Sequence, residues 1–307
     1  MQFVYKLILN RNSILVFAVI LGLVLGDFAA NLQSYTFLAL AVTMSFSMTG
    51  IGMKALLSPK AMVGPMFIGA LLNYLVFGLL VIVLAYFTMP TEQLFYGFVV
   101  IAAAPPGVAI IPFSYILKGD VEYSVAGVLG AFLASVVIAP LYISLFAKSN
   151  GVSSYNLFIM MVQLVLIPLV ISRFLLYKPL FLYIEPVRGK IVDWGFAVLI
   201  FVAVGMNRQV FFASPLILLL VGGVLLAVTF GLGGIYQLVA RRFGVNAPRA
   251  TTQTMLVTIK SSGFSVFTAL ALFGKEAAIP SAVLAVVVLL YLIFLSIKGS
   301  KLKIAAL

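Results

Sequence analysis

Apolar runs, each about as long as a membrane-spanning helix, follow one another along the whole chain. A helix needs about 20 mainly apolar residues to cross the hydrocarbon core of a bilayer. The composition agrees with this pattern, because 64% of the residues are hydrophobic and only 8% are charged. Soluble domains are closer to about a quarter charged. The sequence therefore predicts an all-α integral membrane protein with no room for a soluble second domain.

Charges, prolines and glycines bound these runs and predict ten spans. The spans cover residues 12–28, 33–53, 61–87, 92–117, 121–147, 154–177, 190–206, 209–240, 249–274 and 279–298. The first run follows Lys6 and Arg11, as the apolar part of a signal peptide would, but no small-residue cleavage site is evident after it. We therefore expect this run to remain in the protein as its first span.

The basic residues sort strongly to one side of the ten spans. With a cytoplasmic N-terminus, fifteen of the 19 Lys and Arg residues lie on the cytoplasmic side: Lys6, Arg11, Lys54, Lys60, Lys118, Arg173, Lys178, Arg188, Lys190, Arg241, Arg242, Arg249, Lys298, Lys301 and Lys303. The opposite side holds Lys148, Arg208 and Lys275. This positive-inside asymmetry predicts cytoplasmic termini in a bacterial inner (plasma) membrane. It also explains the net charge of +12 by topology and contact with membrane lipid, with no nucleic acid partner.

The ten spans divide into two halves of five, residues 1–148 and 149–307, which form one membrane domain. Because five is odd, the second half enters the membrane from the opposite side, as in an inverted repeat. The fourth span of each half is interrupted, at residues 104–107 (Ala-Pro-Pro-Gly) and 258–263 (Thr-Ile-Lys-Ser-Ser-Gly). Adjacent prolines open a helix, and an opened helix in a bilayer must face protein or a watery cavity. Matched interruptions indicate the binding site of a secondary transporter.

Lys260 is the one ionisable side chain, tyrosines aside, that falls deep inside a predicted span. A cation at the centre of a bilayer is costly and usually functional; a position nearer the interface is the alternative. The predicted substrate-binding set joins Lys260 to both interruptions and to two polar residues of other spans: Lys260, Ser261, Ser262, Thr258, Pro105, Pro106, Gly107, Val108, Asn73 and Ser124. For the polar members, helix packing and helix–helix hydrogen bonds are the alternative interpretation.

Two stretches resemble the bile acid:sodium symporter family. The first, APPGVAIIPFSYILKGDVEYSVAGVLGAFLASVVIAPL, has Pro105-Pro106-Gly107 where the family has a Pro-Gly-Gly break. It continues with Tyr115–Asp120, similar to the family's Tyr-Leu-x-Lys/Arg-Gly-Asp/Asn turn, and with Ser124-Val125. The second stretch is RRFGVNAPRATTQTMLVTIKSSGFSVFTALALF, and Pro59-Lys60 is also similar. The resemblance implies a ten-helix inverted repeat with core and panel domains, in which broken helices 4 and 9 cross. It also implies alternating-access transport of organic anions, such as bile acids and related carboxylates, with two sodium ions.

The chain departs from this family at the positions tied to sodium. Ile110 and Ile111 stand where the family has Ser-Asn, Val128 where it has Thr, Leu256 where it has Glu, and Lys260-Ser261 where it has Gln-Asn. Since sodium is a hard ion that needs several oxygen ligands, we expect no metal site and sodium-independent transport. We expect the Lys260 ammonium to replace the lost cation and to hold the crossing through exposed carbonyls. The helix starts at 108–110 and 262–264 would add partial positive charge for an anionic group.

Several alternatives stay open at this point. Burial disfavours a charged amine, so release of the Lys260 proton offers proton coupling, with uniport as the other route. A transporter similar to cation/proton antiporters or auxin carriers would share the fold, but no intramembrane Asp is evident. An intramembrane Ser-Lys enzyme is disfavoured because helix neighbours do not face each other. The chain has no Cys and no His, so we expect no enzyme and no cofactor. Sterol acids and small carboxylates are equally compatible with the sequence.

Overall fold

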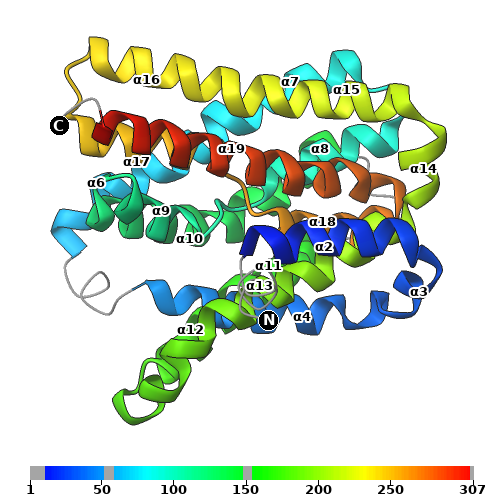
Figure 1. Cartoon of the computed structure of the whole chain (residues 1–307), viewed down its shortest axis with the longest axis horizontal. Coiled ribbons are helices and arrows are strands. Elements are labelled where there is room, and N and C mark those ends of the chain that lie inside the picture. The colour runs from blue at the N-terminus through cyan, green and yellow to red at the C-terminus, as the bar shows by residue number, and fades with distance from the viewer. Residues whose placement is uncertain (1–10, 52–58, 148–153, 305–307) are drawn as a thin grey trace.

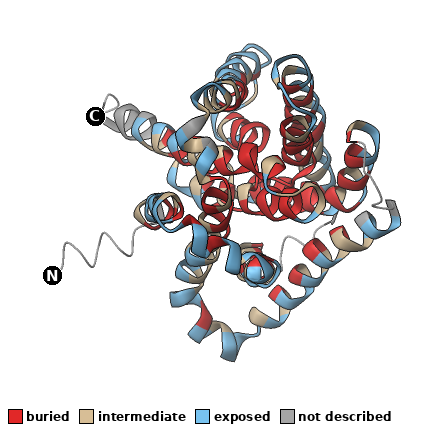
Figure 2. Ribbon diagram, turned by 90° about the vertical axis from the view of Figure 1, so that its right-hand side faces the viewer, coloured by how far each residue is buried: buried red, intermediate tan, exposed pale blue. Residues whose placement is uncertain are grey.

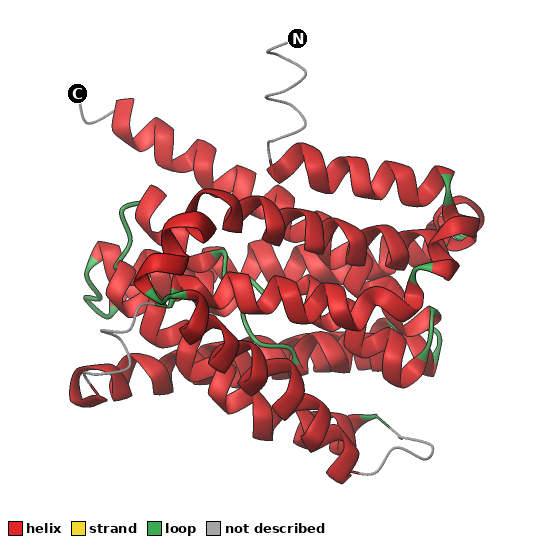
Figure 3. Cartoon of the chain, turned by 90° about the horizontal axis from the view of Figure 1, so that it is seen from below, coloured by secondary structure: helices red, strands yellow, loops and turns green. Residues whose placement is uncertain are grey.

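The computed structural model describes residues 11–51, 59–147 and 154–304, and every regular element in these residues is a helix (Figure 3). In chain order the helices are α2 (Arg11–Val24), α3 (Gly26–Asn31), η1 (Gln33–Tyr35), α4 (Thr36–Ser47), η2 (Met48–Gly50), α6 (Pro59–Ala70), η3 (Leu71–Gly78), α7 (Leu79–Thr88), α8 (Glu92–Ala103), α9 (Ile110–Ile116), α10 (Val121–Phe146), α11 (Ser154–Met161), η4 (Val162–Leu166), α12 (Ile167–Leu175), α13 (Lys178–Met206), α14 (Arg208–Ala213), α15 (Pro215–Leu226), η5 (Ala227–Gly231), α16 (Leu232–Arg242), α17 (Ala247–Thr258), α18 (Ser262–Phe273), η6 (Glu276–Ala278) and α19 (Ile279–Ile304). Lys6, Lys54, Lys148 and the connection 148–153 between the predicted halves lie outside the described residues.

Apolar helices of membrane-spanning length confirm an all-α membrane protein. Within the described residues six helices are long and apolar enough to cross a bilayer: Met62–Thr88, Val121–Phe146, Phe158–Leu175, Lys178–Met206, Pro215–Arg242 and Glu276–Ile297. Ser13–Val24, Glu92–Ala103 and Ser262–Phe273 are shorter apolar helices. The last two are the halves of the predicted fourth and ninth spans that lie beside the interruptions.

The limits of three predicted spans were wrong. The span predicted at 190–206 is the second half of α13, which already begins at Lys178. A proline in the first turn of α13 does not interrupt it, because the first N–H groups of a helix have no helical partner. The span predicted at 209–240 is divided before Pro215, since proline disfavours a helical conformation in the preceding residue. The span predicted at 12–28 is divided between α2 and α3.

The helices pack in two groups (Figure 1). In the first, the α13 group, α13 packs along α2, α3 and α4, and α12 also packs on α4. In the second, the α10 group, α10 packs on α6 and α8, α18 packs between α8 and α19, and α16 lies against α17. The groups meet where α18 contacts α4 and α13. The two interruptions lie between α8 and α9 and between α17 and α18. Both helix pairs therefore belong to the α10 group.

The outer surface of the helices is apolar. Buried residues gather in the middle of the molecule and exposed residues on the outside of the helices (Figure 2). Large apolar side chains are nevertheless exposed, including Phe67, Phe174 and Leu219 at 68%, 70% and 70%. Such wide apolar exposure is a liability in water. It is the surface that a protein surrounded by lipid requires.

Glycines bring α6 and α10 into direct backbone contact. A Cβ atom at Gly69 of α6 would lie 2.6 Å from the Cα atom of Gly127 in α10, closer than real Cβ atoms approach. Small residues allow this kind of close packing between membrane helices. The contact fixes α10 beside η3, the π-helical continuation of α6 that contributes to the site described below.

We expect Gly69→Ala to destabilise the protein by about 1–3 kcal/mol, because the added methyl group meets backbone that cannot move aside as a side chain can. Thermal unfolding of detergent-purified protein measures this loss. Gly223→Ala is the matched control, since a Cβ atom at Gly223 of α15 meets nothing within 4 Å. Equal melting temperatures for the two variants would contradict the close contact.

Candidate functional site

Both predicted interruptions are present as extended chain between two short helices. α8 ends at Ala103 and α9 begins at Ile110, while α17 ends at Thr258 and α18 begins at Ser262. Ala104 leaves the helix with φ −64° and ψ 145°, which is the conformation that a following proline favours. Ile259 and Ser261 are also extended. The sequence therefore correctly identified where these two helices break.

The two extended segments pair with each other. The Gly107 N–H donates to the Ile259 carbonyl at 3.0 Å, and the Ser261 N–H donates to the Pro105 carbonyl at 2.9 Å. Together they form an isolated antiparallel bridge between Pro106 and Lys260. Backbone groups that are freed by a helix break and buried away from water need such partners. The pairing satisfies part of this need and holds α8–α9 against α17–α18.

The Lys260 side chain satisfies more of the freed backbone. Its Nζ atom donates to the carbonyl oxygens of Ala104 at 2.6 Å, Ala102 at 2.9 Å and Asn73 at 3.2 Å. An ammonium has three donors, so all three are used. Ala102 and Ala104 lie at the C-terminal end of α8, where carbonyls lack helical partners and the helix dipole is negative. Lys260 therefore caps α8 from across the crossing.

Two aromatic rings complete the surroundings of the ammonium. Lys260 Nζ lies 4.8 Å from the centre of the Tyr74 ring and 5.3 Å from that of Phe77. Both rings belong to η3, a π-helical segment, and the face of an aromatic ring attracts a cation. Lys260 is only 2% exposed, and no carboxylate of the described residues lies within ion-pair distance of it. Carbonyl dipoles and ring faces thus replace the acidic partner of an ordinary buried lysine.

The other predicted site residues are only partly brought together. Ser261, Ser262, Gly107 and Val108 line a small cavity of about 40 Å³ beside Lys260. Three other predicted residues, Asn73, Pro105 and Pro106, lie at the crossing itself, where the Asn73 Nδ2 atom donates to the Ala104 carbonyl at 3.3 Å. The Asn73 Oδ1 atom is buried and has no hydrogen-bond partner among the described residues.

Ser124 and Thr258 form hydrogen bonds within their own helices. The Ser124 hydroxyl donates to the Val121 carbonyl at 2.7 Å, and the Thr258 hydroxyl donates to the Thr254 carbonyl at 2.7 Å. Hydroxyls commonly bond back to their own helix in this way. Each therefore binds its own helix, and neither residue lines the two cavities described for this site.

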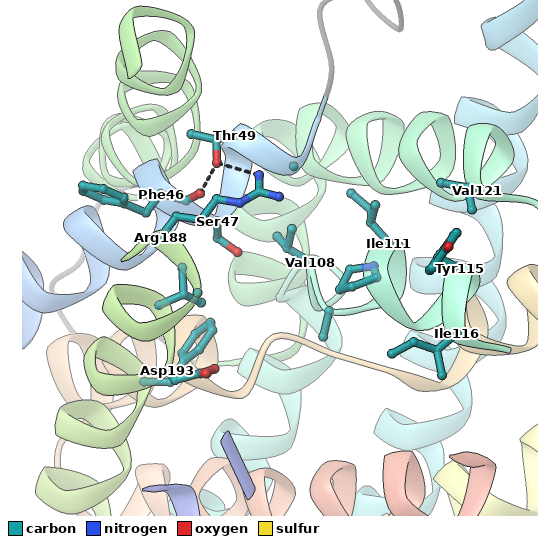
Figure 4. A pocket seen from close by; sticks show the side chains of 16 residues that line it. Phe46, Ser47, Thr49, Val108, Ile111, Tyr115, Ile116, Val121, Arg188 and Asp193 are labelled. Atoms are coloured by element: carbon teal, nitrogen blue, oxygen red, sulfur yellow. Dashed lines mark hydrogen bonds between the residues drawn. The ribbon is translucent and has the colours of Figure 1, made fainter. Parts of the chain in front are cut away.

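A larger cavity of about 760 Å³ adjoins the small one, and Val108, Ala109 and Phe196 line both (Figure 4). It lies between the two helix groups and is lined by Phe46, Ser47, Thr49, Gly50, Val108, Ala109, Ile111, Pro112, Tyr115, Ile116, Val121, Arg188, Gly189, Val192, Asp193 and Phe196. Sequence reasoning missed its polar residues on α4, η2 and α13. Arg188 carried only a topological signal, and nothing local pairs it with Thr49, 139 residues away.

Comparison with known proteins shows the family to which the chain is related. The model of the sodium bile acid symporter family matches residues 37–214, more than half of the chain. The chain belongs to this family. It is 26% identical over 250 residues to "Probable sodium/metabolite cotransporter BASS1, chloroplastic" of Arabidopsis thaliana, covering 79% of this chain and 62% of that protein. It is 27% identical over 227 residues to "Uncharacterized sodium-dependent transporter YocS" of Bacillus subtilis (strain 168), covering 71% of this chain and 68% of that protein.

The chain spans less than two thirds of the plant relative's length. The family and both relatives' printed names are those of transporters, and they point to a transporter rather than to the Ser-Lys enzyme considered from the sequence.

Sodium, which the family name implies, does not fit the side chains at the corresponding positions. Ile110, Ile111, Val128 and Leu256 are all buried, and their side chains are hydrocarbon without oxygen. The Leu256 side chain fills the space beside Gly127, where its Cδ1 atom lies 2.6 Å from the position of an added Cβ. Hydrocarbon therefore occupies the places where this family's sodium ligands were expected.

We expect Lys260→Ala to lower stability by about 3 kcal/mol or more, because it leaves buried carbonyls without a donor. Propylammonium supplies the atoms that the substitution removes and should raise the variant's melting temperature while leaving the native chain unchanged. Tetramethylammonium is the control, since it is a cation without N–H donors. Equal increases in the melting temperature of Lys260→Ala by the two cations would contradict the hydrogen-bonded cation site.

Proposed function

We propose that this chain is a sodium-independent secondary transporter of organic anions that works by alternating access, with the Lys260 ammonium in place of a bound cation. The observation that carries the proposal is the set of three carbonyl oxygens around Lys260 Nζ, at 2.6, 2.9 and 3.2 Å. Carbonyl oxygens around a monovalent charge are what a cation site in a broken-helix transporter would provide. Here the protein supplies that charge itself.

The architecture that we propose is a ten-span inverted repeat made of residues 1–148 and 149–307. The α10 group would be the core domain and the α13 group the panel domain, with the cavity of about 760 Å³ between them. The matched breaks in α8–α9 and α17–α18 support this assignment, since corresponding breaks characterise inverted repeats. The positive-inside pattern supports cytoplasmic termini in a bacterial inner membrane.

Anionic substrates are supported by the charge near the crossing. The Lys260 ammonium and the start of α18 contribute positive potential beside Ser261 and Ser262, and Arg188 lines the larger cavity. Proton release from Lys260 is the alternative coupling mechanism. The three carbonyl acceptors favour the fixed charge instead, because a neutral amine has two donors and would direct its lone pair at the third oxygen.

We expect the initial rate of carboxylate uptake into proteoliposomes to change less than about twofold when sodium is replaced by potassium or choline, as expected when no oxygen cage selects sodium. Tritiated cholate and pyruvate are suitable probes of the large and small classes, and protein-free liposomes correct for leakage. Strict dependence on sodium would overturn the proposal.

Lys260→Ala should abolish this uptake, because the crossing loses the charge that holds it together. Lys260→Gln should leave the transporter without any sodium response, since Leu256, Ile110, Ile111 and Val128 still offer no oxygen. Both are measured in the same proteoliposomes with and without sodium. Normal uptake by Lys260→Ala would remove this residue from the mechanism.

A further inference from the structure

The larger cavity has one polar and one apolar wall. Its polar side chains on α4, η2 and α13 are Ser47, Thr49, Arg188 and Asp193. The wall formed by α9 presents Ile111, Pro112 and Ile116, with Tyr115 at its exposed end. Figure 4 shows Arg188 and Thr49 on one side of the cavity and Tyr115 and Ile116 on the other. A ligand that fits both walls has a polar end and an apolar body.

Arg188 is held in place at the polar wall, which also carries Asp193. Its Nη1 atom donates to the Thr49 hydroxyl at 3.3 Å, and that hydroxyl in turn donates to the Phe46 carbonyl at 2.6 Å. Thr49 is buried, so it fixes the position of the guanidinium. The Phe181 ring lies 5.7 Å from the guanidinium carbon. No carboxylate of the described residues lies within ion-pair distance of Arg188.

A second arginine, Arg173, lies at the same end of α4 and has a structural role. Arg173 donates to the carbonyl oxygens of Met48 and Ile51, each at 2.7 Å, and to the Ser172 hydroxyl. Its guanidinium is used to cap the end of η2. Within the described part of the chain Arg188 makes one side-chain hydrogen bond, to a neutral hydroxyl, although a guanidinium has five donors in a planar fork. Most of the binding capacity of Arg188 is therefore available to a ligand in the cavity.

We propose that Arg188 binds the anionic head group of the transported molecule, which is an amphipathic organic anion whose apolar body lies against α9. This inference rests on the proposed function and extends it by naming the residue that binds the negative charge of the substrate. A guanidinium matches a carboxylate or sulfonate with two parallel hydrogen bonds and stays charged at all physiological pH values. Thr49 is a positioning residue, because its hydrogen bond orients the Arg188 guanidinium toward the cavity.

The volume of the cavity supports a large substrate. Sites that enclose drug-sized organic molecules have volumes of about 300–1,000 Å³, and this cavity has about 760 Å³. A carboxylate of three or four carbons would leave most of the apolar wall in contact with water. An acid with a fused-ring or long-chain body would cover Ile111, Ile116 and Phe196 while its charge reached Arg188.

The test compares cholate with its uncharged methyl ester on protein in nanodiscs. Binding of tritiated cholate is measured directly and binding of the ester by competition. In the native chain cholate should bind about tenfold more tightly than the ester, the usual difference for a charge-assisted pair. Arg188→Gln should weaken cholate binding about tenfold and leave the ester unchanged. Arg188→Lys should weaken cholate severalfold, because lysine keeps the charge but not the fork.

Lys190→Gln is the matched control, because it removes an equal charge from an exposed position on the same helix and outside the cavity. It should leave both affinities unchanged, and melting temperatures check that each variant is folded.

Equal weakening of cholate and ester binding by Arg188→Gln would assign this residue a structural role and overturn the inference. Unchanged cholate affinity in Arg188→Gln would also overturn it, while sodium-independent cholate uptake by the native chain would leave the proposed function intact. No cholate binding by the native chain would overturn the large amphipathic class, whereas pyruvate uptake tests the proposed function separately.

Discussion

The contact between the Lys260 ammonium and the carbonyl oxygens at the end of α8 is the interaction on which the centre of this molecule depends. Pro105 and Pro106 prevent α8 from continuing, so its last carbonyls would be buried without partners in the membrane interior. Pairing with the chain at 259–261 satisfies two backbone donors, and Lys260 satisfies three acceptors. Each break is therefore stabilised by the other, and neither helix pair is complete alone.

Around this centre the two cavities differ in the side chains that line them. The small cavity is lined by residues of the two breaks and by apolar residues of α2, α13 and α19. The larger cavity takes its apolar wall from α9 and its charged wall from α4, η2 and α13. Because the charged wall and the broken helices belong to different groups, a ligand in this cavity would contact both groups at once. That is the arrangement in which movement between two groups of helices changes access to a site.

Local chemistry determined what could be predicted from the sequence. The prolines at 105 and 106, and a lysine inside an apolar run, identify the two breaks and the buried cation without any tertiary information. The start of α13 was misplaced because its first turns carry charged residues that hide the helix from an apolarity criterion. The partners of Lys260, the inward bonds of Ser124 and Thr258, and the meeting of Arg188 with Thr49 depend on how helices pack, and no periodicity in the chain encodes them.

A cation that is covalently attached to its carrier also changes the electrical work of each cycle. If Lys260 remains protonated throughout, its charge returns with the empty protein, and the net charge that crosses the membrane is that of the substrate alone. Movement of a monoanion is then electrogenic, and a membrane potential of about 100 mV is worth about 2.3 kcal/mol per charge. With the interior negative, the potential by itself would then oppose accumulation of the anion inside the cell.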